Sequence, residues 1–96
     1  MHKHANVVRF RVKPGYQDQF EKSFADRPVF EGMTSSYLVR TGEQSYCSVG
    51  IWESEDKMVA ARPQMIAFLD SFRANLEELS PELGVTDPVS GVVITE

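Results

Sequence analysis

Apolar and polar side chains alternate along residues 6–13. An alternation with a period of two is typical of a strand that is buried on one side, and here it places Asn6, Val8, Phe10 and Val12 on one face. A Pro-Gly pair ends the strand. The amide of Asn6 therefore shares its face with three apolar side chains, where a buried polar group needs a hydrogen-bond partner.

From Tyr16 onward the apolar spacing becomes helical, with Phe20 and Phe24 one and two turns further along the same face. Charged residues fill the positions between them. The helix is expected to end before Arg27, because Arg27 precedes a proline and such a residue disfavours the α region.

Two more strands are predicted at residues 33–41 and 45–52, and a short turn containing glycine joins them. This pattern favours an antiparallel hairpin. Gly50 inside the later strand indicates either a bulge or a backbone that another group approaches closely. Alternation divides that strand into one face with Cys47, Val49 and Ile51 and another with Tyr46, Ser48, Gly50 and Trp52.

After Trp52 the chain passes directly into a helix. Ser54 suits the N-cap, because its hydroxyl can accept from a free backbone N–H group of the first turn. The two acidic residues that follow it complement the positive end of the helix dipole. We expect a short helix over residues 54–62 that ends or kinks near Pro63.

The strongest helical pattern covers residues 64–79, and a final strand is predicted at residues 89–95 with Gly91 as a possible bulge. The helix carries one apolar stripe, formed by Met65, Phe68, Leu69, Phe72, Leu76 and Leu79. The final strand has apolar side chains on both faces.

The element order βαββαβ predicts an α+β, ferredoxin-like domain over residues 1–96, with both helical regions on one face of a four-stranded antiparallel sheet. The other face must meet water or a partner. Tyr46, Trp52 and Val93 suit water poorly on that face. We therefore expect a homodimer in which a two-fold-related copy covers the open face of the sheet.

Composition excludes several classes of protein. The 96 residues carry a net charge of −4, which disfavours a nucleic-acid partner because phosphate binding needs clustered cations. There is no apolar run long enough to span a membrane and no signal-like N-terminus. The single cysteine fits a reducing compartment. We expect a cytoplasmic protein without a metal-ligand cluster or a nucleotide-binding motif.

Three segments together resemble the antibiotic biosynthesis monooxygenase family of dimeric α+β barrels. They are VVRFRVKPGYQDQFEKSF near the start, SYCSVGIWESEDKMVAA in the middle, and the last strand after DPVSG. The resemblance implies a dimer that packs sheet to sheet and a pocket between sheet and helices in each subunit. It also implies one of several activities, which include cofactor-independent oxygenation of quinol-like aromatics and haem degradation.

The haem-degrading members use an Asn on the first strand, a Trp on the helix after the third strand, and an iron-ligating His on the next helix. Asn6 matches the first of these positions. The segment after Trp52 contains no further Trp, and residues 64–79 contain no His. The two histidines, His2 and His4, are expected in a frayed N-terminus. The sequence therefore favours a chain without a haem cofactor.

Cofactor-free oxygenation requires a pocket that binds and polarises an electron-rich molecule. The resemblance suggests Asn6, Tyr37 and Trp52 as catalytic candidates, and no metal or cofactor. Each also has a structural interpretation: Asn6 as a satisfied amide near a strand end, and Tyr37 and Trp52 as core or interface residues. Candidates for substrate binding are Phe10, Arg40, Tyr46, Arg62, Phe68 and Phe72.

Three functions stay open from the sequence. The first is a monooxygenase that acts on a small aromatic or quinol-type molecule. The second is a non-catalytic ligand-binding or structural homodimer of the same fold. The third is an isomerase or decyclase, because one fold supports several chemistries. A pocket into which Asn6 and an Arg or Tyr both point would favour an enzyme.

Overall fold

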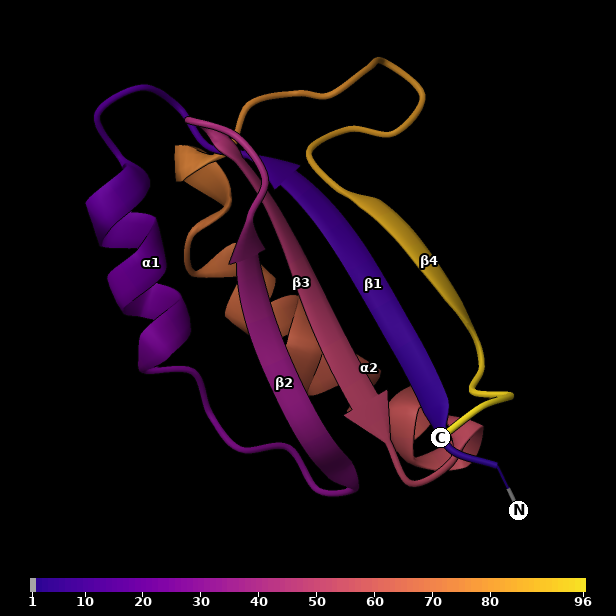
Figure 1. Cartoon of the computed structure of the whole chain (residues 1–96). Coiled ribbons are helices and arrows are strands. Elements are labelled where there is room, and N and C mark those ends of the chain that lie inside the picture. Colours follow the sequence, from indigo (N-terminus) through magenta and orange to yellow (C-terminus); the bar gives the residue numbers. More distant parts are fainter. Residues whose placement is uncertain (1) are drawn as a thin grey trace.

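Four antiparallel strands form one sheet in the order β2-β3-β1-β4 in the computed structural model, which describes residues 2–96 (Figure 1). The elements in chain order are β1 (His4–Arg11), α1 (Gln17–Ala25), β2 (Met33–Arg40), β3 (Ser45–Trp52), α2 (Glu55–Asp70), the 3-10 turn η1 (Arg73–Asn75) and β4 (Asp87–Val92). The predicted ferredoxin-like order is confirmed. β1 and β3 occupy the middle of the sheet, so their side chains dominate both faces.

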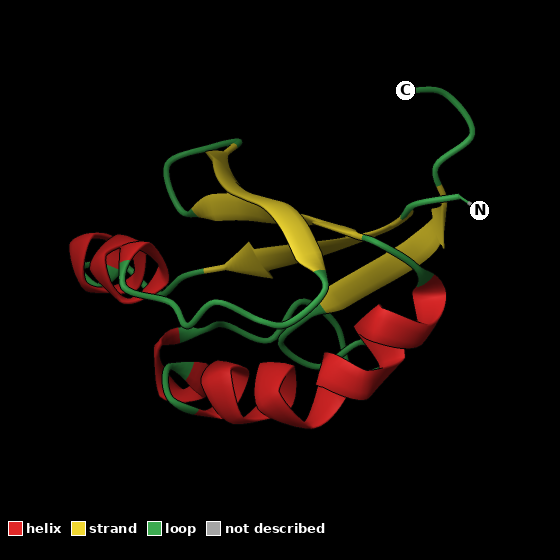
Figure 2. Ribbon diagram, turned by 90° about the horizontal axis from the view of Figure 1, so that it is seen from below, coloured by secondary structure: helices red, strands yellow, loops and turns green. Residues whose placement is uncertain are grey.

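The helices lie on one side of the sheet, and the opposite face is uncovered in this chain (Figure 2). Ser54 caps α2 as predicted, with its Oγ accepting from the backbone N–H of Lys57 at 3.3 Å. α1 packs Phe20 and Phe24 against Phe10 of β1, with ring centroids 5.7 and 6.3 Å away. The predicted amphipathic face of α1 therefore holds that helix against the sheet.

The helix does not end at Pro63, which was one of the two expected outcomes there, because α2 runs from Glu55 to Asp70 with Pro63 inside it. The helix then ends, instead of continuing to residue 79. Phe72 and Leu76 are nevertheless buried, since a turn and η1 keep them directed into the core. Leu76 forms an isolated bridge with Val12. Of the six residues in the predicted apolar stripe, Phe72 and Leu76 are buried, and the other four are half-buried.

His4 is not part of a frayed terminus. It begins β1, lies opposite Trp52 on one side and Val92 on the other, and is only 6% exposed. Both neighbouring strands reach to this end of β1, so the strand starts two residues earlier than its alternation pattern indicates. β4 likewise begins at Asp87 and ends at Val92, earlier than predicted.

Tyr46 and Trp52 point toward the helices and not toward the open face. Trp52 is fully buried and Tyr46 is 2% exposed, so the expectation that they meet a partner subunit is wrong. The alternation pattern was correct, since these residues share one face of β3. The prediction that this face of β3 lies away from the helices was wrong. Both faces of the strand carry apolar side chains, so the pattern does not indicate which face the helices cover.

Two groups of buried side chains make up the core. The larger group lies between the sheet and both helical regions, and the smaller one surrounds Trp52 with Phe30, Met58 and Ala61. Phe68 contacts both groups. Within residues 2–96, no helix is long and apolar enough to cross a membrane.

Candidate functional site

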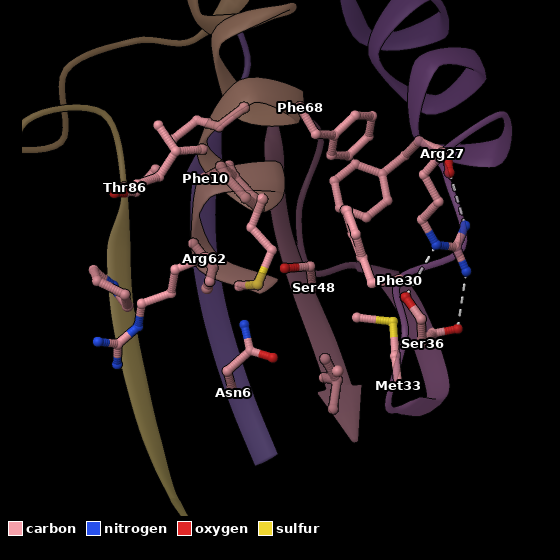
Figure 3. A pocket seen from close by; sticks show the side chains of 18 of the residues that line it. Asn6, Phe10, Arg27, Phe30, Met33, Ser36, Ser48, Arg62, Phe68 and Thr86 are labelled. Atoms are coloured by element: carbon pink, nitrogen blue, oxygen red, sulfur yellow. Dashed lines mark hydrogen bonds between the residues drawn. The ribbon is translucent and has the colours of Figure 1, made fainter. Parts of the chain in front are cut away.

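A pocket of about 290 Å³ separates the two core groups, between the helix-facing side of the sheet and α2 (Figure 3). Its floor comes from β1, β2 and β3, and its roof comes from α2 and the turn that follows. The residues that line it are Asn6, Val8, Phe10, Phe24, Arg27, Phe30, Met33, Ser36, Ser48, Val49, Gly50, Arg62, Met65, Ile66, Phe68, Leu69, Phe72, Thr86 and Pro88.

The side chain of Asn6 is held in one orientation by Trp52. The indole N–H donates to Oδ1 of Asn6 at 2.7 Å, and the indole itself is fixed by burial and by stacking on Phe30 at 6.2 Å between centroids. Because Oδ1 is the acceptor, Nδ2 is the atom that faces the pocket (Figure 3). The amide nitrogen has no protein acceptor among residues 2–96 and is available to a ligand.

The absence of a side chain at Gly50 leaves space for the Asn6 amide. It lies opposite Asn6 in the β1–β3 register, and a Cβ at Gly50 would lie 2.6 Å from Asn6 Oδ1 and 3.2 Å from the indole nitrogen of Trp52. Of the two interpretations of this glycine, the structure supports the close approach. The register irregularity of the sheet falls in β2, between Met33 and Ser35.

Phenylalanine rings form the wall of the pocket. Phe68 packs edge-on against Phe72 and Phe24, at 5.0 and 5.3 Å between centroids. Phe72 in turn packs edge-on against Phe10 at 6.2 Å. Edge-to-face contacts of this kind fix the rings relative to one another. The pocket thus presents a largely preformed apolar wall, suited to a planar aromatic ligand.

Two arginines lie on opposite sides of this wall (Figure 3). Arg27 donates to the carbonyl of Phe24 at 2.7 Å and to the Oγ and carbonyl of Ser36 at 3.0 and 3.1 Å. Arg62 extends from α2 over the β4 side and has no hydrogen-bond or ion-pair partner among residues 2–96. The lining contains no carboxylate, so the pocket carries a positive charge.

The structure brings five of the nine predicted site residues into this pocket. They are Asn6, Phe10, Arg62, Phe68 and Phe72. Trp52 lies behind Asn6 and acts on the pocket through it. Tyr37 projects from the opposite face of the sheet, where it is 60% exposed.

The remaining two predicted residues, Arg40 and Tyr46, border a second cavity of about 320 Å³ beside α1. The hydroxyl of Tyr46 donates to Oε2 of Glu21 at 2.5 Å, and Arg40 donates to the same oxygen. The Tyr46 hydrogen bond and the Arg40 guanidinium hold the pKa of the Glu21 carboxyl below its ordinary value. Burial, and the carboxylate beside it, raise the pKa of the Tyr46 phenol. These groups join α1 to the sheet.

Sequence reasoning missed Arg27, Met33 and Ser36 as pocket residues. The sequence marks Arg27 only as a residue before a proline, and it lies in the connection between α1 and β2. Nothing in the local sequence shows that its guanidinium bonds to Ser36, because the two residues meet only when β2 joins the sheet.

A family model for antibiotic biosynthesis monooxygenases matches residues 4–63, which is more than half of the chain. The chain therefore belongs to the antibiotic biosynthesis monooxygenase family, as its three quoted segments indicated. No curated protein sequence matches it.

Several solved structures share the fold. NE2512, a protein of unknown function from Nitrosomonas europaea, is 21% identical and aligns over 100% of this chain and 93% of its own, with a TM-score of 0.80. SnoaB, a cofactor-independent oxygenase from Streptomyces nogalater, is 18% identical over 100% and 97%, with a TM-score of 0.67. A mutant of MhuD with two manganese protoporphyrin IX molecules per active site is 22% identical over 97% and 96%, with a TM-score of 0.69. At these identities the likeness shows the fold alone.

The lining of the pocket does not fit an axially ligated haem. Protein ligands of haem iron are chiefly His, Cys and Tyr, with Met serving beside a His. Within residues 2–96 the lining supplies the thioethers of Met33 and Met65 but no imidazole, thiolate or phenol. His4 is buried in the sheet outside the pocket.

Proposed function

We propose that this protein is a cofactor-independent monooxygenase that acts on a small aromatic molecule of the quinol or anthrone type, bound between the sheet and α2. One observation carries the proposal: Trp52 fixes Asn6 so that its amide N–H group points into an apolar, phenylalanine-walled pocket. The membership of the chain in the antibiotic biosynthesis monooxygenase family supports the same reaction class. The shared fold of SnoaB, a cofactor-independent oxygenase, is consistent with it.

The reaction needs no external reductant when the substrate has an activated ring CH₂ group. One oxygen atom of O₂ becomes a carbonyl oxygen on that carbon. The other leaves as water with the two hydrogens that the carbon loses. All electrons therefore come from the substrate.

The ionised substrate is the form that transfers an electron to O₂, so the protein has to favour the anion. Nδ2 of Asn6 can donate to the ring oxygen on which the negative charge develops, and a fixed donor in an apolar site is an effective stabiliser. Arg27 and Arg62 add a positive field. No side chain in the lining is a ready general base, so the proton passes to water and the substrate must itself be acidic.

Oxygen uptake by the purified protein with a panel of quinols and anthrones tests this function. We expect uptake above a buffer control and one atom of isotope-labelled O₂ in the product. Asn6→Asp keeps an oxygen acceptor for Trp52 but removes the amide donor, and it should lower kcat by about 100-fold. Gln64→Leu removes an exposed amide outside the pocket and should leave kcat unchanged.

Two results would overturn the proposal. The first is the absence of uptake above the control across the whole panel. The second is a kcat of Asn6→Asp equal to that of the unaltered protein, because the amide donor would then have no part in the reaction. Circular dichroism of each variant establishes that it is folded.

A further inference from the structure

We infer that the molecule bound in this pocket is an aromatic carboxylate whose carboxylate group pairs with Arg62. The aromatic part of this ligand rests on the proposed function. The negative charge of the ligand is the new element. Its basis is an imbalance of charge between the pocket and the rest of the molecule.

The chain has 14 acidic and 10 basic residues, yet the pocket lining contains two arginines and no acidic residue. The four ion pairs within residues 2–96 all involve other cations, namely Lys3, Arg40, Lys57 and Arg73. Four surface cations, Arg9, Arg11, Lys13 and Lys22, also form no ion pair within residues 2–96, but only Arg27 and Arg62 line the pocket. A lining with two guanidiniums and no carboxylate is suited to an anion.

Arg27 supports this inference independently of Arg62. Its guanidinium is half-buried and held by three hydrogen bonds, but all of the acceptors are neutral. A charge removed from water is normally compensated by an opposite charge. Within residues 2–96 the Arg27 guanidinium also lies 5.7 Å from the centroid of the Phe24 ring but pairs with no carboxylate, and an anionic ligand in the same pocket would supply the opposite charge.

Arg62 is the group that is placed to bind the anion directly. Its guanidinium lies on the β4 side of the pocket, where Thr86 also borders the cavity, and all of its N–H donors are uncommitted among residues 2–96 (Figure 3). A guanidinium pairs with a carboxylate through two parallel hydrogen bonds. The phenylalanine wall would hold the ring, Asn6 the ring oxygen, and Arg62 the carboxylate.

Calorimetric titration under anaerobic conditions tests this assignment without turnover. The probes are an ortho-hydroxynaphthoate and the carboxamide of the same shape, which is neutral. We expect the unaltered protein to bind the carboxylate at least about tenfold more tightly than the carboxamide. The preference should shrink as salt is added, because an exposed ion pair is screened.

Arg62→Gln should abolish the preference, with binding of the carboxylate weakened about tenfold and binding of the carboxamide changed less than about twofold. Arg62→Lys retains the charge and should retain part of the preference. Arg73→Gln is the matched control, since it removes a surface cation that pairs with Asp70 outside the pocket. It should bind both probes as the unaltered protein does.

Equal binding of the two probes by the unaltered protein, or binding of neither, would overturn the inference. So would an Arg62→Gln variant that weakens both probes equally, because the arginine would then act through its aliphatic stem. Failure of the oxygen-uptake experiment with a carboxylate preference present would remove the proposed oxygenase and leave the ligand class intact. Oxygen uptake without a carboxylate preference would leave the proposed oxygenase intact and remove the carboxylate as the ligand class.

Discussion

The indole N–H of Trp52 donates to the side-chain oxygen of Asn6 over a distance of 2.7 Å, and this bond decides which end of the amide the pocket sees. The two residues are 46 positions apart in the sequence and meet because β1 and β3 pair. An asparagine that could rotate freely would present its oxygen or its nitrogen. Trp52 leaves the nitrogen as the end that meets a ligand.

Trp52→Phe should therefore lower both stability and ligand affinity. The substitution leaves a cavity in a fully buried site and removes the donor to Asn6. We expect the free energy of unfolding to fall by about 2–3 kcal/mol. Urea denaturation followed by circular dichroism measures it, since the variant has no tryptophan. A loss below about 0.5 kcal/mol would show that neither the packing nor the hydrogen bond matters to stability.

Gly50→Ala tests the same relationship from the floor of the pocket. The added methyl group would lie 2.6 Å from Asn6 Oδ1, so the amide has to move away from Trp52. We expect a stability loss of about 1–3 kcal/mol and weaker binding of aromatic ligands.

Gly91→Ala is the control for that substitution. Gly91 is also a strand glycine, but no atom lies within 4 Å of the position that its Cβ would occupy. It should keep its ligand affinity and gain slightly in stability, because alanine loses less conformational freedom than glycine on folding. If Gly50→Ala also kept its ligand affinity, the close contact between the added methyl group and Asn6 would not affect the pocket.

The contact between Tyr46 and Glu21 makes stability depend on pH at both ends of the range. The folded protein holds the pKa of Glu21 below its ordinary value of 4.5, so this contribution is present above pH 4.5 and is lost as the pH falls through the lowered pKa. The pKa of Tyr46 is raised above 10.0, so its contribution is present below pH 10.0 and is lost as the pH rises through the raised pKa.

Tyr46→Phe should therefore be less stable than the unaltered protein at neutral pH, with a difference that narrows toward strong acid. Thermal melts across the pH range measure this difference. Tyr16→Phe serves as the control, because Tyr16 is a more exposed tyrosine and its side chain has no hydrogen-bond partner among residues 2–96. A difference for Tyr46→Phe that stays constant down to strong acid would show that Glu21 is not the relevant partner.

Alternation and helical spacing were enough to predict the order of elements and most of the buried residues. They could not predict which face of β3 is covered, since Tyr46 and Trp52 on one side are as apolar as Val49 and Ile51 on the other. Nor could they predict the register that places Gly50 opposite Asn6. The site depends on that register. Individual pocket residues could therefore be predicted from the sequence, but their arrangement around Asn6 could not.

Pro63 illustrates how tertiary packing overrides a local signal. It lies inside α2, where its ring removes one hydrogen-bond donor, yet the helix continues to Asp70 because Ala61 and Phe68 on either side of it pack into the core. The carbonyl that it leaves without a helical partner belongs to Val59, a 44% exposed residue where water can reach.

Pro63→Ala should consequently stabilise the protein. The new backbone N–H at position 63 can donate to the carbonyl of Val59, and the expected gain is about 1–2 kcal/mol after the added freedom of the unfolded chain is subtracted. Thermal denaturation measures it. Pro81→Ala, in a turn outside the helices, should bring no gain. A destabilised Pro63→Ala variant would mean that the proline geometry itself supports α2.

The uncovered face of the sheet leads to the last prediction. Tyr37, Val39 and Val89 project from it and are 60%, 45% and 64% exposed in this chain. Such a cluster of apolar side chains is typical of a surface that another protein covers. We propose that a second copy of the chain does so, which would also give the Tyr37 hydroxyl a place at the rim of an interface.

Sedimentation at micromolar concentration should then give twice the subunit mass of 10.8 kDa. Tyr37→Glu places a charge on the face and should shift the mass toward one subunit. Gln64→Glu adds the same charge on exposed α2 and should leave the mass unchanged. A mass near one subunit for the unaltered protein would contradict the dimer. It would also require the open face to remain in water, where its valines give no stabilisation.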